Sequence, residues 1–317
     1  MVLSGYWVLC MNDPLAARID IFWHDLPDSL QKQARQNEPL SGHTTLRLGG
    51  PADIWLPVQS VDDLIQVTQL AREQAIPTFI LGGGANLLIR DSGIRGLVIE
   101  NRANKVQFRD QYVIAESGAV NPRLAKQCTQ RGLSGLEWLV GVPGTIGGAT
   151  VNNAGAYGQS MADTLLQAEL LDLDGQRRWY PVAWFEYQYR SSKLKKQAEK
   201  SFVLQVELHL TPQQTNAINQ TMQTYNERRR ATQPPGATIG SMFKNPPGDY
   251  AGRLIEAAGL KGYRINQAQI SPIHANFFIN LGSAQADDVI ALIELAQKAV
   301  LEKFGISLTL EVEIVPA

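Results

Sequence analysis

The sequence predicts an α+β protein of two domains, and three observations lead to this prediction. The chain has 317 residues, about the length of two average domains. Its first third contains a strand–helix–strand pattern that ends in consecutive glycines, and its middle third is rich in strand patterns. Its last third combines helices with short strands. Hydrophobic residues make up 44% and charged residues 19% of the chain, which excludes disorder for most of it.

Residues 1–38 are expected to form a leader or helix ahead of the main fold. The chain begins with a short apolar stretch, but its first basic residue is Arg18. A secretory signal places basic residues before its apolar stretch, so we interpret this start as an irregular leader, with an early start site before Met11. No apolar stretch approaches the roughly 20 residues that a membrane-spanning helix needs.

A first domain is predicted over residues 39–211, and it begins with an α/β unit. The strand expected at 52–57 leads into a helix that starts at Val61 and carries apolar residues at helical spacing. A buried strand at 78–81 then runs directly into three glycines. Two further strands, at 96–100 and 112–115, and a helix at 122–131 closed by Gly132 are expected to follow.

The rest of the first domain is predicted to consist mainly of strands. Residues 170–180 are typical of a hairpin around Asp174 and Gly175, a pair that favours a type I′ turn. Residues 202–210 alternate strictly, with Phe202 and every second residue after it on one face. This pattern predicts a half-buried strand.

A second domain is predicted over residues 212–317. It starts with a polar, helix-prone stretch that ends in a basic cluster at 228–230. A loop at 236–250 and a helix at 250–258 stopped by Gly259 are expected next.

The end of the second domain is predicted to contain a strand at 276–280, a long helix and a last strand. Ser283 is the expected cap of the long helix, which ends at Gly305. In the last strand, alternation puts Glu311 and Glu313 together on the face opposite the apolar one, and periodicity does not decide whether that face is solvent or a cleft. The residues expected on the buried face of the helix are Val289, Ile293, Ala296 and Val300.

Composition also excludes several classes of function. Lys and Arg number 29 against 30 Asp and Glu, so the net charge of -1 gives no bulk attraction to nucleic acid or to an anionic membrane. Cys10 and Cys128 lie too far apart in the sequence to suggest a disulfide framework. The histidines and cysteines show no metal-ligand spacing, so no metal is expected. We therefore expect a cytoplasmic protein.

Two glycine clusters are the first candidates for a ligand site. Phosphate-loop and Rossmann glycine patterns are absent from the sequence. The glycines at 82–84, followed by Ala85 and Asn86, come directly after a buried strand, and their N–H groups can form a nest for a phosphate. The second cluster spans 141–148 and 153–158, where so many glycines favour a planar cofactor packed against the backbone. Structural turns explain both clusters equally well on glycine content alone.

Two polar loops are further candidates. Residues 240–246 combine Ser241, Lys244 and Asn245, which offer a hydroxyl, an ammonium group and an amide. Tyr189 and Arg190 suit recognition of a carboxylate or diphosphate. A lone serine is more often a helix cap, and an adjacent aromatic–arginine pair is more often a surface contact.

In their order along the chain, these blocks resemble the UDP-N-acetylenolpyruvoylglucosamine reductase family, also called UDP-N-acetylmuramate dehydrogenase, of peptidoglycan synthesis. The resemblance extends from about residue 39 to the end and is closer to the shorter, type II-like subtype of the family. The blocks that carry it are 44–53, 82–86, 142–148, 153–158, 189–192, 240–246, 251–262, 274–277 and 311–312.

The resemblance implies a fold and a reaction. The fold is an FAD-binding domain of the vanillyl-alcohol-oxidase type, with two α/β lobes around the flavin, and a C-terminal α+β substrate-binding domain. The reaction is the NADPH-dependent, FAD-mediated reduction of UDP-N-acetylglucosamine enolpyruvate to UDP-N-acetylmuramate. NADPH reduces the flavin, hydride then reaches C3 of the enolpyruvyl ether, and a proton reaches C2. The step serves cell wall biogenesis and thereby cell shape and division.

The resemblance also implies roles for individual residues. Arg190 supplies a permanent cation, Glu311 is an acid kept protonated by burial, and Ser241 donates the proton to C2. The residues implied in substrate binding are Tyr189, Lys244 and Asn245. Those implied in FAD binding are Thr45, Gly82, Gly83, Gly84, Ala85, Asn86, Gly141, Pro143, Gly144, Gly147, Gly148, Ala154, Gly155 and Tyr157.

The sequence departs from the family pattern beside one of these residues, and two other functions stay open. Glu313 stands where the family usually has arginine, which puts a like charge near Glu311. An FAD-dependent alcohol or hydroxy-acid oxidase of the same fold would give the 240–246 loop no proton-donor role. A flavin or nucleotide-sugar binding protein would need no proton donor at all. We expect non-covalent FAD, NADPH as donor, no nucleic acid or membrane partner, and a monomer or weak homo-oligomer.

Overall fold

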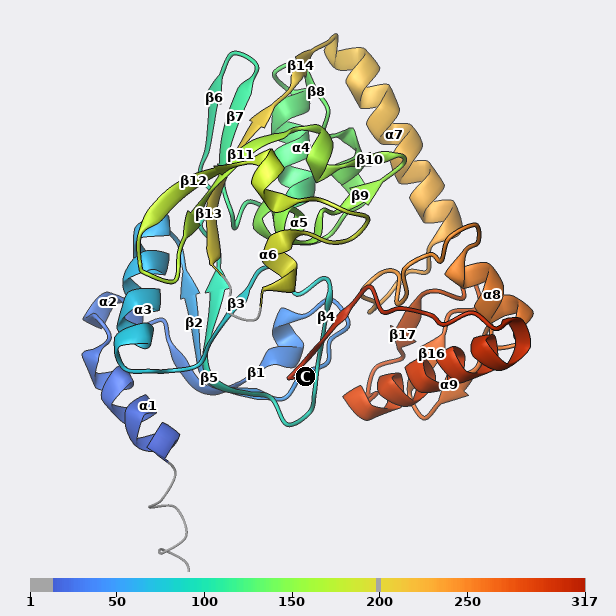
Figure 1. The fold of residues 1–317 in the computed structure, drawn as a ribbon, viewed down its shortest axis with the longest axis horizontal. Coiled ribbons are helices and arrows are strands. Elements are labelled where there is room, and N and C mark those ends of the chain that lie inside the picture. Colours follow the sequence, from blue (N-terminus) through green and yellow to red (C-terminus); the bar gives the residue numbers. More distant parts are fainter. Residues whose placement is uncertain (1–13, 198–200, 317) are drawn as a thin grey trace, which may run out of the picture.

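The computed structural model describes residues 14–197 and 201–316 (Figure 1). The expectations for the apolar start of the chain and for Met11 lie outside the described residues. Two lobes and a C-terminal domain surround a central cavity.

The first lobe is built on a four-stranded sheet with the order β1 (Arg35–Pro39), β2 (Pro51–Val58), β5 (Ile94–Asn101), β3 (Thr78–Leu81). Strands β2, β5 and β3 are parallel, and β1 pairs with β2 in the antiparallel direction. Helix α3 (Val61–Glu73) connects β2 to β3, as the apolar spacing predicts. The Ser60 hydroxyl caps it by accepting a hydrogen bond from the Asp63 N–H at 3.1 Å.

Residues 14–38 are part of this lobe and do not stand ahead of it. Helices α1 (Pro14–Asp25) and α2 (Asp28–Gln31) bury Phe22 and Leu30 in the core of the first lobe, and Leu26 from the link between them is buried there too. Strand β1 then adds an edge to the sheet. The polar side chains of β1 are mostly exposed, so its sequence carries no alternation that would predict a strand.

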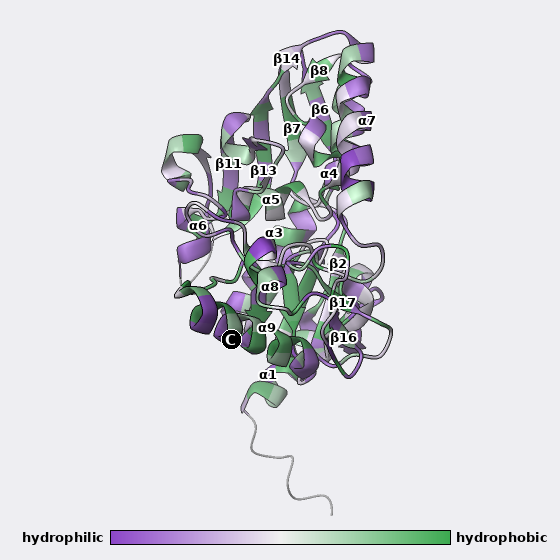
Figure 2. Cartoon of the chain, turned by 90° about the vertical axis from the view of Figure 1, so that its right-hand side faces the viewer, coloured by the Kyte–Doolittle hydropathy of each residue, from purple (hydrophilic) through white to green (hydrophobic). Residues whose placement is uncertain are grey.

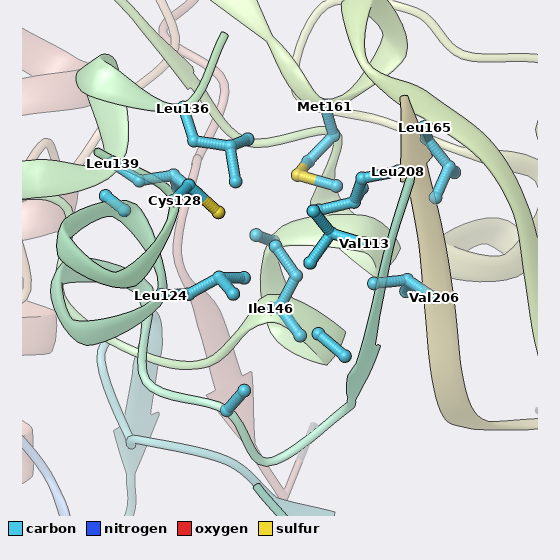
Figure 3. Close-up of a cluster of buried hydrophobic side chains, with 14 of the residues drawn as sticks. Val113, Leu124, Cys128, Leu136, Leu139, Ile146, Met161, Leu165, Val206 and Leu208 are labelled. Atoms are coloured by element: carbon cyan, nitrogen blue, oxygen red, sulfur yellow. The ribbon is translucent and has the colours of Figure 1, made fainter. Parts of the chain in front are cut away.

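The second lobe is built on a five-stranded antiparallel sheet with the order β12 (Arg177–Pro181), β11 (Leu165–Leu171), β13 (Phe202–His209), β7 (Tyr112–Glu116), β6 (Val106–Arg109). Helices α4 (Asn121–Thr129) and α5 (Ile146–Asn152) contribute to its core. Figure 3 shows Cys128, Met161, Val206 and Leu208 among the side chains that meet there. Strand β13 buries Leu204, Val206 and Leu208, as predicted, but it also buries Val203 from the opposite face.

The hairpin between β11 and β12 is present, but its turn is not of type I′. A type I′ turn needs positive φ at both central residues, and of the predicted pair only Gly175 has it, at 79°. The Asp172 N–H donates to the Gln176 carbonyl at 2.9 Å, and the Gly175 N–H donates to the Asp172 carbonyl at 3.0 Å. The loop is therefore longer than a two-residue type I′ turn, and Gly175 is its residue in the left-handed conformation.

Helix α7 (Thr215–Thr232) follows the second lobe and runs along the outside of the molecule to the C-terminal domain (Figure 1). It buries only Ile218 and Met222, and Figure 2 shows it as largely hydrophilic. The domain beyond it packs α8 (Ala251–Ala257) and α9 (Ala286–Phe304) with the sheet β15 (Arg264–Ile265), β16 (Ala268–Ile270), β17 (Phe278–Asn280).

Helix α9 differs from the prediction at its start. Gln285 is its N-cap, in a capping box with Asp288, so the expectation of Ser283 as the cap is wrong. Gly305 ends the helix with φ 68°, and Val289, Ile293, Ala296 and Val300 are buried as predicted.

The last strand returns to the first lobe. Strand β18 (Glu313–Val315) is shorter than predicted and pairs in parallel with β4 (Leu87–Ile89), directly after the 82–86 loop (Figure 1). Among the described residues, no helix is both long and apolar enough to cross a membrane. The remaining short elements are η1 (Leu40–His43), β8 (Leu133–Ser134), η2 (Glu137–Gly141), β9 (Gly155–Ala156), β10 (Gln159–Ser160), η3 (Met161–Asp163), η4 (Val182–Phe185), α6 (Lys193–Lys196) and β14 (Thr211–Pro212).

Candidate functional site

A single large cavity gathers most of the residues that the sequence singles out. Its volume is about 1270 Å³, which exceeds the usual range for one small ligand. Both lobes contribute to its wall, together with the end of α7, the 239–241 loop and the last strand. A cavity of this size suits a dinucleotide with a second molecule beside it.

The first glycine loop forms part of the wall and is tightly packed from behind. A Cβ on Gly83 would lie 2.7 Å from Gly144 Cα, and one on Gly84 would lie 2.1 Å from the His43 carbonyl oxygen. Gly84 also has φ +57°. Thr45 supports this loop from behind, because its N–H donates to the Gly84 carbonyl at 3.1 Å. Only glycine fits these positions, whether or not a ligand is bound.

The second glycine cluster lies at the start of α5. The Thr145 hydroxyl caps this helix by accepting a hydrogen bond from the Gly148 N–H at 3.4 Å. A Cβ on Gly147 would lie 2.7 Å from Ser117 Cβ, so the packing of the chain requires this glycine. A Cβ on Gly148 would meet only Thr145 Oγ1, at 3.8 Å. Since Gly148 lies on the cavity wall, the space beside it is available to a ligand.

Unpaired polar atoms on the wall agree with a large polar ligand. Thr68 Oγ1, Asn121 Oδ1 and Gln233 Oε1 are buried, and none has a hydrogen-bond partner among the described residues. Buried polar atoms are rarely left without a partner in a folded protein. With the open space at Gly148, they fit a bound FAD, whose ribityl, ribose and ring groups offer donors and acceptors.

Arg190 is held at the cavity by a strained turn. Its φ is 53°, in the left-handed region, between two hydrogen bonds that join Gln188 and Ser191. The Asn153 side chain fixes this turn by donating to the Gln188 carbonyl at 3.0 Å. Two residues on, the buried Ser192 hydroxyl donates to the Val151 carbonyl at 2.6 Å. These contacts tie the Arg190 turn to the second glycine cluster.

Arg190 and Glu311 form an ion pair across the cavity wall. Arg190 Nε donates to Glu311 Oε1 at 2.7 Å, and Arg190 Nη2 donates to the Gly155 carbonyl. Burial raises the pKa of Glu311 above its ordinary value, although the positive charges of Arg190, Lys195 and Lys244 act in the opposite direction. The carboxyl group therefore holds its proton to higher pH than an exposed glutamate does.

Ser241 is brought beside Glu311 through backbone pairing. The Glu311 N–H donates to the carbonyl of Met242, the residue after Ser241, at 2.9 Å. The buried Asn276 side chain holds the same loop by accepting from the Phe243 N–H at 2.9 Å and donating to the Phe243 carbonyl at 2.8 Å. Ser241, Arg190 and Glu311 all line the cavity.

Most of the residues expected to bind FAD line the cavity, but the expected substrate residues do not. Thr45 and Gly141 do not line the cavity themselves but contact residues that do, Gly84 and Arg229. Tyr189, Lys244 and Asn245 lie outside the wall, and Asn245 uses its side-chain oxygen to accept a hydrogen bond from the Ala251 N–H at 3.1 Å. The expected residues that do line the cavity are Gly82, Gly83, Gly84, Ala85, Asn86, Pro143, Gly144, Gly147, Gly148, Ala154, Gly155 and Tyr157.

Three asparagines make contacts at the site that the sequence does not predict, although Asn86 itself is among the residues expected to bind FAD. The Asn86 side chain donates to the Glu311 carbonyl at 3.3 Å, and its own carbonyl accepts from the Glu313 N–H at 3.0 Å. Asn86 thus joins the first glycine loop to the last strand. Asn153 and Asn276 act in the same way on the loops of Arg190 and Ser241. Their blocks are part of the family resemblance, but only coordinates reveal which loop each side chain holds.

Two family models match the chain. Residues 52–180 match the model described as an FAD binding domain. Residues 232–315 match the model described as the C-terminal domain of UDP-N-acetylenolpyruvoylglucosamine reductase. The first range lies in the two lobes, and the second contains the Ser241 loop and Glu311.

Curated relatives and a solved structure resemble the chain over most of its length. The UDP-N-acetylenolpyruvoylglucosamine reductase of Moorella thermoacetica is 42% identical over 294 residues, which are 92% of this chain and 96% of that protein. The reductase of Bacillus subtilis is 39% identical over 282 residues, 88% of this chain and 93% of that protein. The crystal structure of UDP-N-acetylenolpyruvylglucosamine reductase from Thermus caldophilus superposes with a TM-score of 0.77 at 36% identity, covering 89% of this chain and 100% of that one.

Proposed function

The chain belongs to the UDP-N-acetylenolpyruvoylglucosamine reductase family, and we propose that Arg190, Ser241 and Glu311 carry out its reaction. The protein is an FAD-dependent oxidoreductase of peptidoglycan synthesis that reduces UDP-N-acetylglucosamine enolpyruvate with NADPH. No observation favours the alternatives of an oxidase or of a binding protein without activity. The convergence of the three side chains on one cavity, from distant parts of the sequence, is the observation that supports their roles.

The reaction requires a site that stabilises negative charge. When bound, FAD supplies the hydride chemistry of the reduction. Addition of hydride to C3 of the enolpyruvyl group places negative charge on C2 and on the adjacent carboxylate. A fixed cation aimed at that charge lowers the barrier, since it needs no reorganisation during the reaction. Arg190 provides this cation from a turn that hydrogen bonds hold in place.

Glu311 acts as the acid beside this cation. Its burial favours the protonated form, which can donate a hydrogen bond to the developing enolate. The ion pair with Arg190 limits this effect and keeps both groups in position. Substrate carboxylate can compete with Glu311 for the guanidinium, and such competition would favour proton retention on Glu311.

Ser241 delivers the proton to C2. A serine hydroxyl is a weak acid, so it can act only on a strongly basic carbon beside it. The Met242–Glu311 backbone bond and the Asn276 side chain fix the position of its loop. Because the loop is fixed, the hydroxyl is already oriented, and less conformational entropy is lost when the transition state forms.

The two glycine clusters hold the FAD. The 82–86 loop would offer backbone N–H groups to the diphosphate, and the flavin ring would lie against the cavity-lining residues at 143–145, 147–148 and 154–157. Thr45 and Gly141 support these loops from behind. Tyr189, Lys244 and Asn245 contact the substrate beyond the cavity wall, where Lys244 is near enough to affect Glu311.

We also propose the organisation and the location of the protein. Residues 39–211 form the main part of the FAD-binding domain, to which residues 14–38 add α1, α2 and the edge strand β1, and residues 212–317 form the substrate-binding domain. The protein works in the cytoplasm, where NADPH and the sugar nucleotide are available, as a monomer or weak homo-oligomer.

Replacing Ser241 tests the proposed roles directly. In the Ser241→Ala variant, anaerobic reduction of the flavin by NADPH should proceed as in the wild type. Reoxidation by the enolpyruvyl sugar nucleotide should slow roughly 100- to 10,000-fold, because the proton donor is missing. Stopped-flow absorbance of the flavin separates the two half-reactions.

The Ser241→Cys variant is the matched control for this measurement. It keeps a proton on the same atom position, so it should recover part of the reoxidation rate. Equal slowing of both half-reactions in Ser241→Ala would contradict the role of Ser241 as proton donor.

A further inference from the structure

Tyr187 has no part in the mechanism above, yet it lies three residues before Arg190. Its hydroxyl donates to the Thr150 carbonyl at 2.8 Å, near the end of helix α5. Burial raises the pKa of this phenol above its ordinary value, so the hydroxyl keeps its proton and remains a donor throughout the physiological range. The bond joins segments that are 37 positions apart in the sequence.

The end of α5 holds the chain on both sides of Arg190. The last carbonyl groups of an α-helix lack regular partners within it and need them from elsewhere. Tyr187 supplies one such partner before the arginine. After it, the Ser192 hydroxyl donates to the Val151 carbonyl at 2.6 Å, one residue beyond the carbonyl that Tyr187 binds. The backbone that carries Arg190 is thus attached to this helix at two points.

The side chain of Arg190 reaches the same end of the helix. Its Nη2 donates to the carbonyl of Gly155, three residues after α5 ends, and its Nε donates to Glu311 Oε1 at 2.7 Å. The other end of α5, at Gly147 and Gly148, lies on the cavity wall. With seven residues the helix is about 10 Å long. One short helix therefore sets the distance between the wall expected to bind the flavin and the cation.

The backbone between Tyr187 and Arg190 is bounded by strained residues. Glu186 has φ 46° and Arg190 has φ 53°, in the left-handed region that residues with a side chain seldom adopt. Such conformations persist where the surrounding contacts over-determine them. Tyr187 directly follows the first of the two, and its ring packs on Phe185 with centroids 5.3 Å apart. Its ring and its hydroxyl together fix the start of this stretch.

We propose that Tyr187 is a positioning residue for the reaction and that it acts through Arg190. Its hydroxyl holds the Arg190 turn against the end of α5 and so fixes the guanidinium relative to the flavin and the enolpyruvyl carboxylate. Tyr187 itself is not part of the cavity wall. A displacement of about 1 Å caused by a distant side chain can nevertheless slow a reaction about a hundredfold. The inference rests on the proposed function, because it takes Arg190 as the cation of that reaction.

Tyr187→Phe tests the proposal, because it removes only the hydroxyl and keeps the ring that packs on Phe185. The two half-reactions are followed by anaerobic stopped-flow absorbance on the full-length holoenzyme. Reduction of the flavin by NADPH should proceed as in the wild type. Reoxidation by the enolpyruvyl sugar nucleotide should slow roughly three- to tenfold, which corresponds to the loss of one hydrogen bond.

Tyr180→Phe is the matched control. The Tyr180 hydroxyl also makes a hydrogen bond within the second lobe, to Asp172 Oδ2 at 2.7 Å, but this partner belongs neither to α5 nor to the Arg190 turn. The same chemical change at this position should leave both half-reactions at their wild-type rates.

A double-mutant cycle with Arg190→Lys shows whether Tyr187 acts through the arginine. Lysine keeps a positive charge but lacks the planar fork that binds Glu311 and Gly155 together. In the Arg190→Lys background, Tyr187→Phe should therefore slow reoxidation less than about twofold, because the group that it positions is absent. A merely structural role would give the same slowing in both backgrounds.

Each other result has a definite meaning. Wild-type reoxidation in Tyr187→Phe overturns the proposal, and so does equal slowing in the two backgrounds. Equal slowing of both half-reactions, or a variant too unstable to be purified with its flavin, also overturns it, because the hydroxyl is then structural. In these cases the proposed function stands. Wild-type protein whose reduced flavin is not reoxidised by the sugar nucleotide, or an Arg190→Lys variant with the wild-type rate, would refute the proposed function itself.

Discussion

The balance of forces on Glu311 decides whether it can act as an acid. Burial raises the pKa of this carboxyl group, and the ion pair with Arg190 lowers it. Burial is the larger effect, so the pKa of Glu311 in the folded protein lies above that of an exposed glutamate. The proton is then bound more tightly in the folded protein than in the unfolded chain, and the two states differ in their response to pH.

Replacing Glu311 should change how stability depends on pH. Because the folded pKa is raised, Glu311 contributes stability below the ordinary carboxyl pKa, and this contribution is lost as pH rises through the raised value. The contribution amounts to about 1.4 kcal/mol for each unit of the shift. The free energy of unfolding is measured in urea from about pH 4 to pH 8 for the wild type and for Glu311→Gln. The value for the wild type minus that for the variant should decrease as the pH rises.

The matched control is Glu302→Gln, on the exposed side of α9, where the carboxylate pairs with Lys298 at 3.9 Å. Its difference from the wild type should show little dependence on pH. A difference between wild type and Glu311→Gln that grows with pH would mean that Arg190 outweighs burial, and Glu311 would then be a poor acid.

At this scale the sequence reveals residue types but not their contacts. Arg190 and Glu311 are 121 positions apart, and no local spacing predicts their ion pair. Both are identified by the resemblance to a family. Asn86, Asn153 and Asn276 hold the site loops through contacts of 33 to 225 positions. Such roles follow from tertiary packing, so only a three-dimensional structure reveals them.

At the scale of elements, two adjacent glycines at the start of α5 have different reasons to be glycine. Gly147 is required by the chain, because a Cβ there would overlap Ser117. Gly148 is not required by the chain, because a Cβ there meets only Thr145 Oγ1 at 3.8 Å. If FAD lies against this helix, Gly148 keeps the space free for it.

Alanine substitutions at the two glycines should therefore have opposite effects. Gly148→Ala should fold with an unchanged or higher melting temperature, since alanine favours a helix, and should bind FAD about tenfold more weakly. Gly147→Ala should lower the free energy of unfolding by about 1–3 kcal/mol through overpacking. Thermal melts of the apoprotein and fluorescence titrations with FAD measure both effects. Gly148→Ala with wild-type FAD affinity would place the flavin elsewhere in the cavity.

Elements with strong periodicity are predicted well, and those set by distant partners are not. Helix α3 lies where its apolar spacing predicts, because it buries one face in a local core. Strand β3 lies at the predicted residues, but only Leu81 of the expected buried strand is buried, and Phe79 and Ile80 line the cavity. Strand β1 is polar and exists only because β2 offers it an edge. In the stretch predicted as the last strand, Leu308 and Val312 are buried and Leu310 and Ile314 are partly buried, but only Glu313–Val315 pairs as a strand, with β4. Backbone pairing between segments this far apart leaves no local pattern in either sequence.

At the scale of the whole molecule, the last strand connects the parts that must act together. Strand β18 carries the chain from the C-terminal domain back to β4, next to the first glycine loop. Asn86 bonds to the backbone on both sides of Val312 and thereby joins this loop to Glu311. The short parallel pairing of β18 with β4 thus holds the 82–86 loop, expected to bind the cofactor, next to Glu311, the expected acid. This arrangement brings the first glycine loop and Glu311 to the wall of the same cavity.

The most direct test of this account is an anaerobic visible spectrum of the purified protein. It should show a flavin that bleaches on adding NADPH and returns on adding UDP-N-acetylglucosamine enolpyruvate. Such a result would establish the cofactor, the donor and the acceptor together. A flavin that bleaches but returns only with oxygen, or a protein that binds no flavin, would contradict the account.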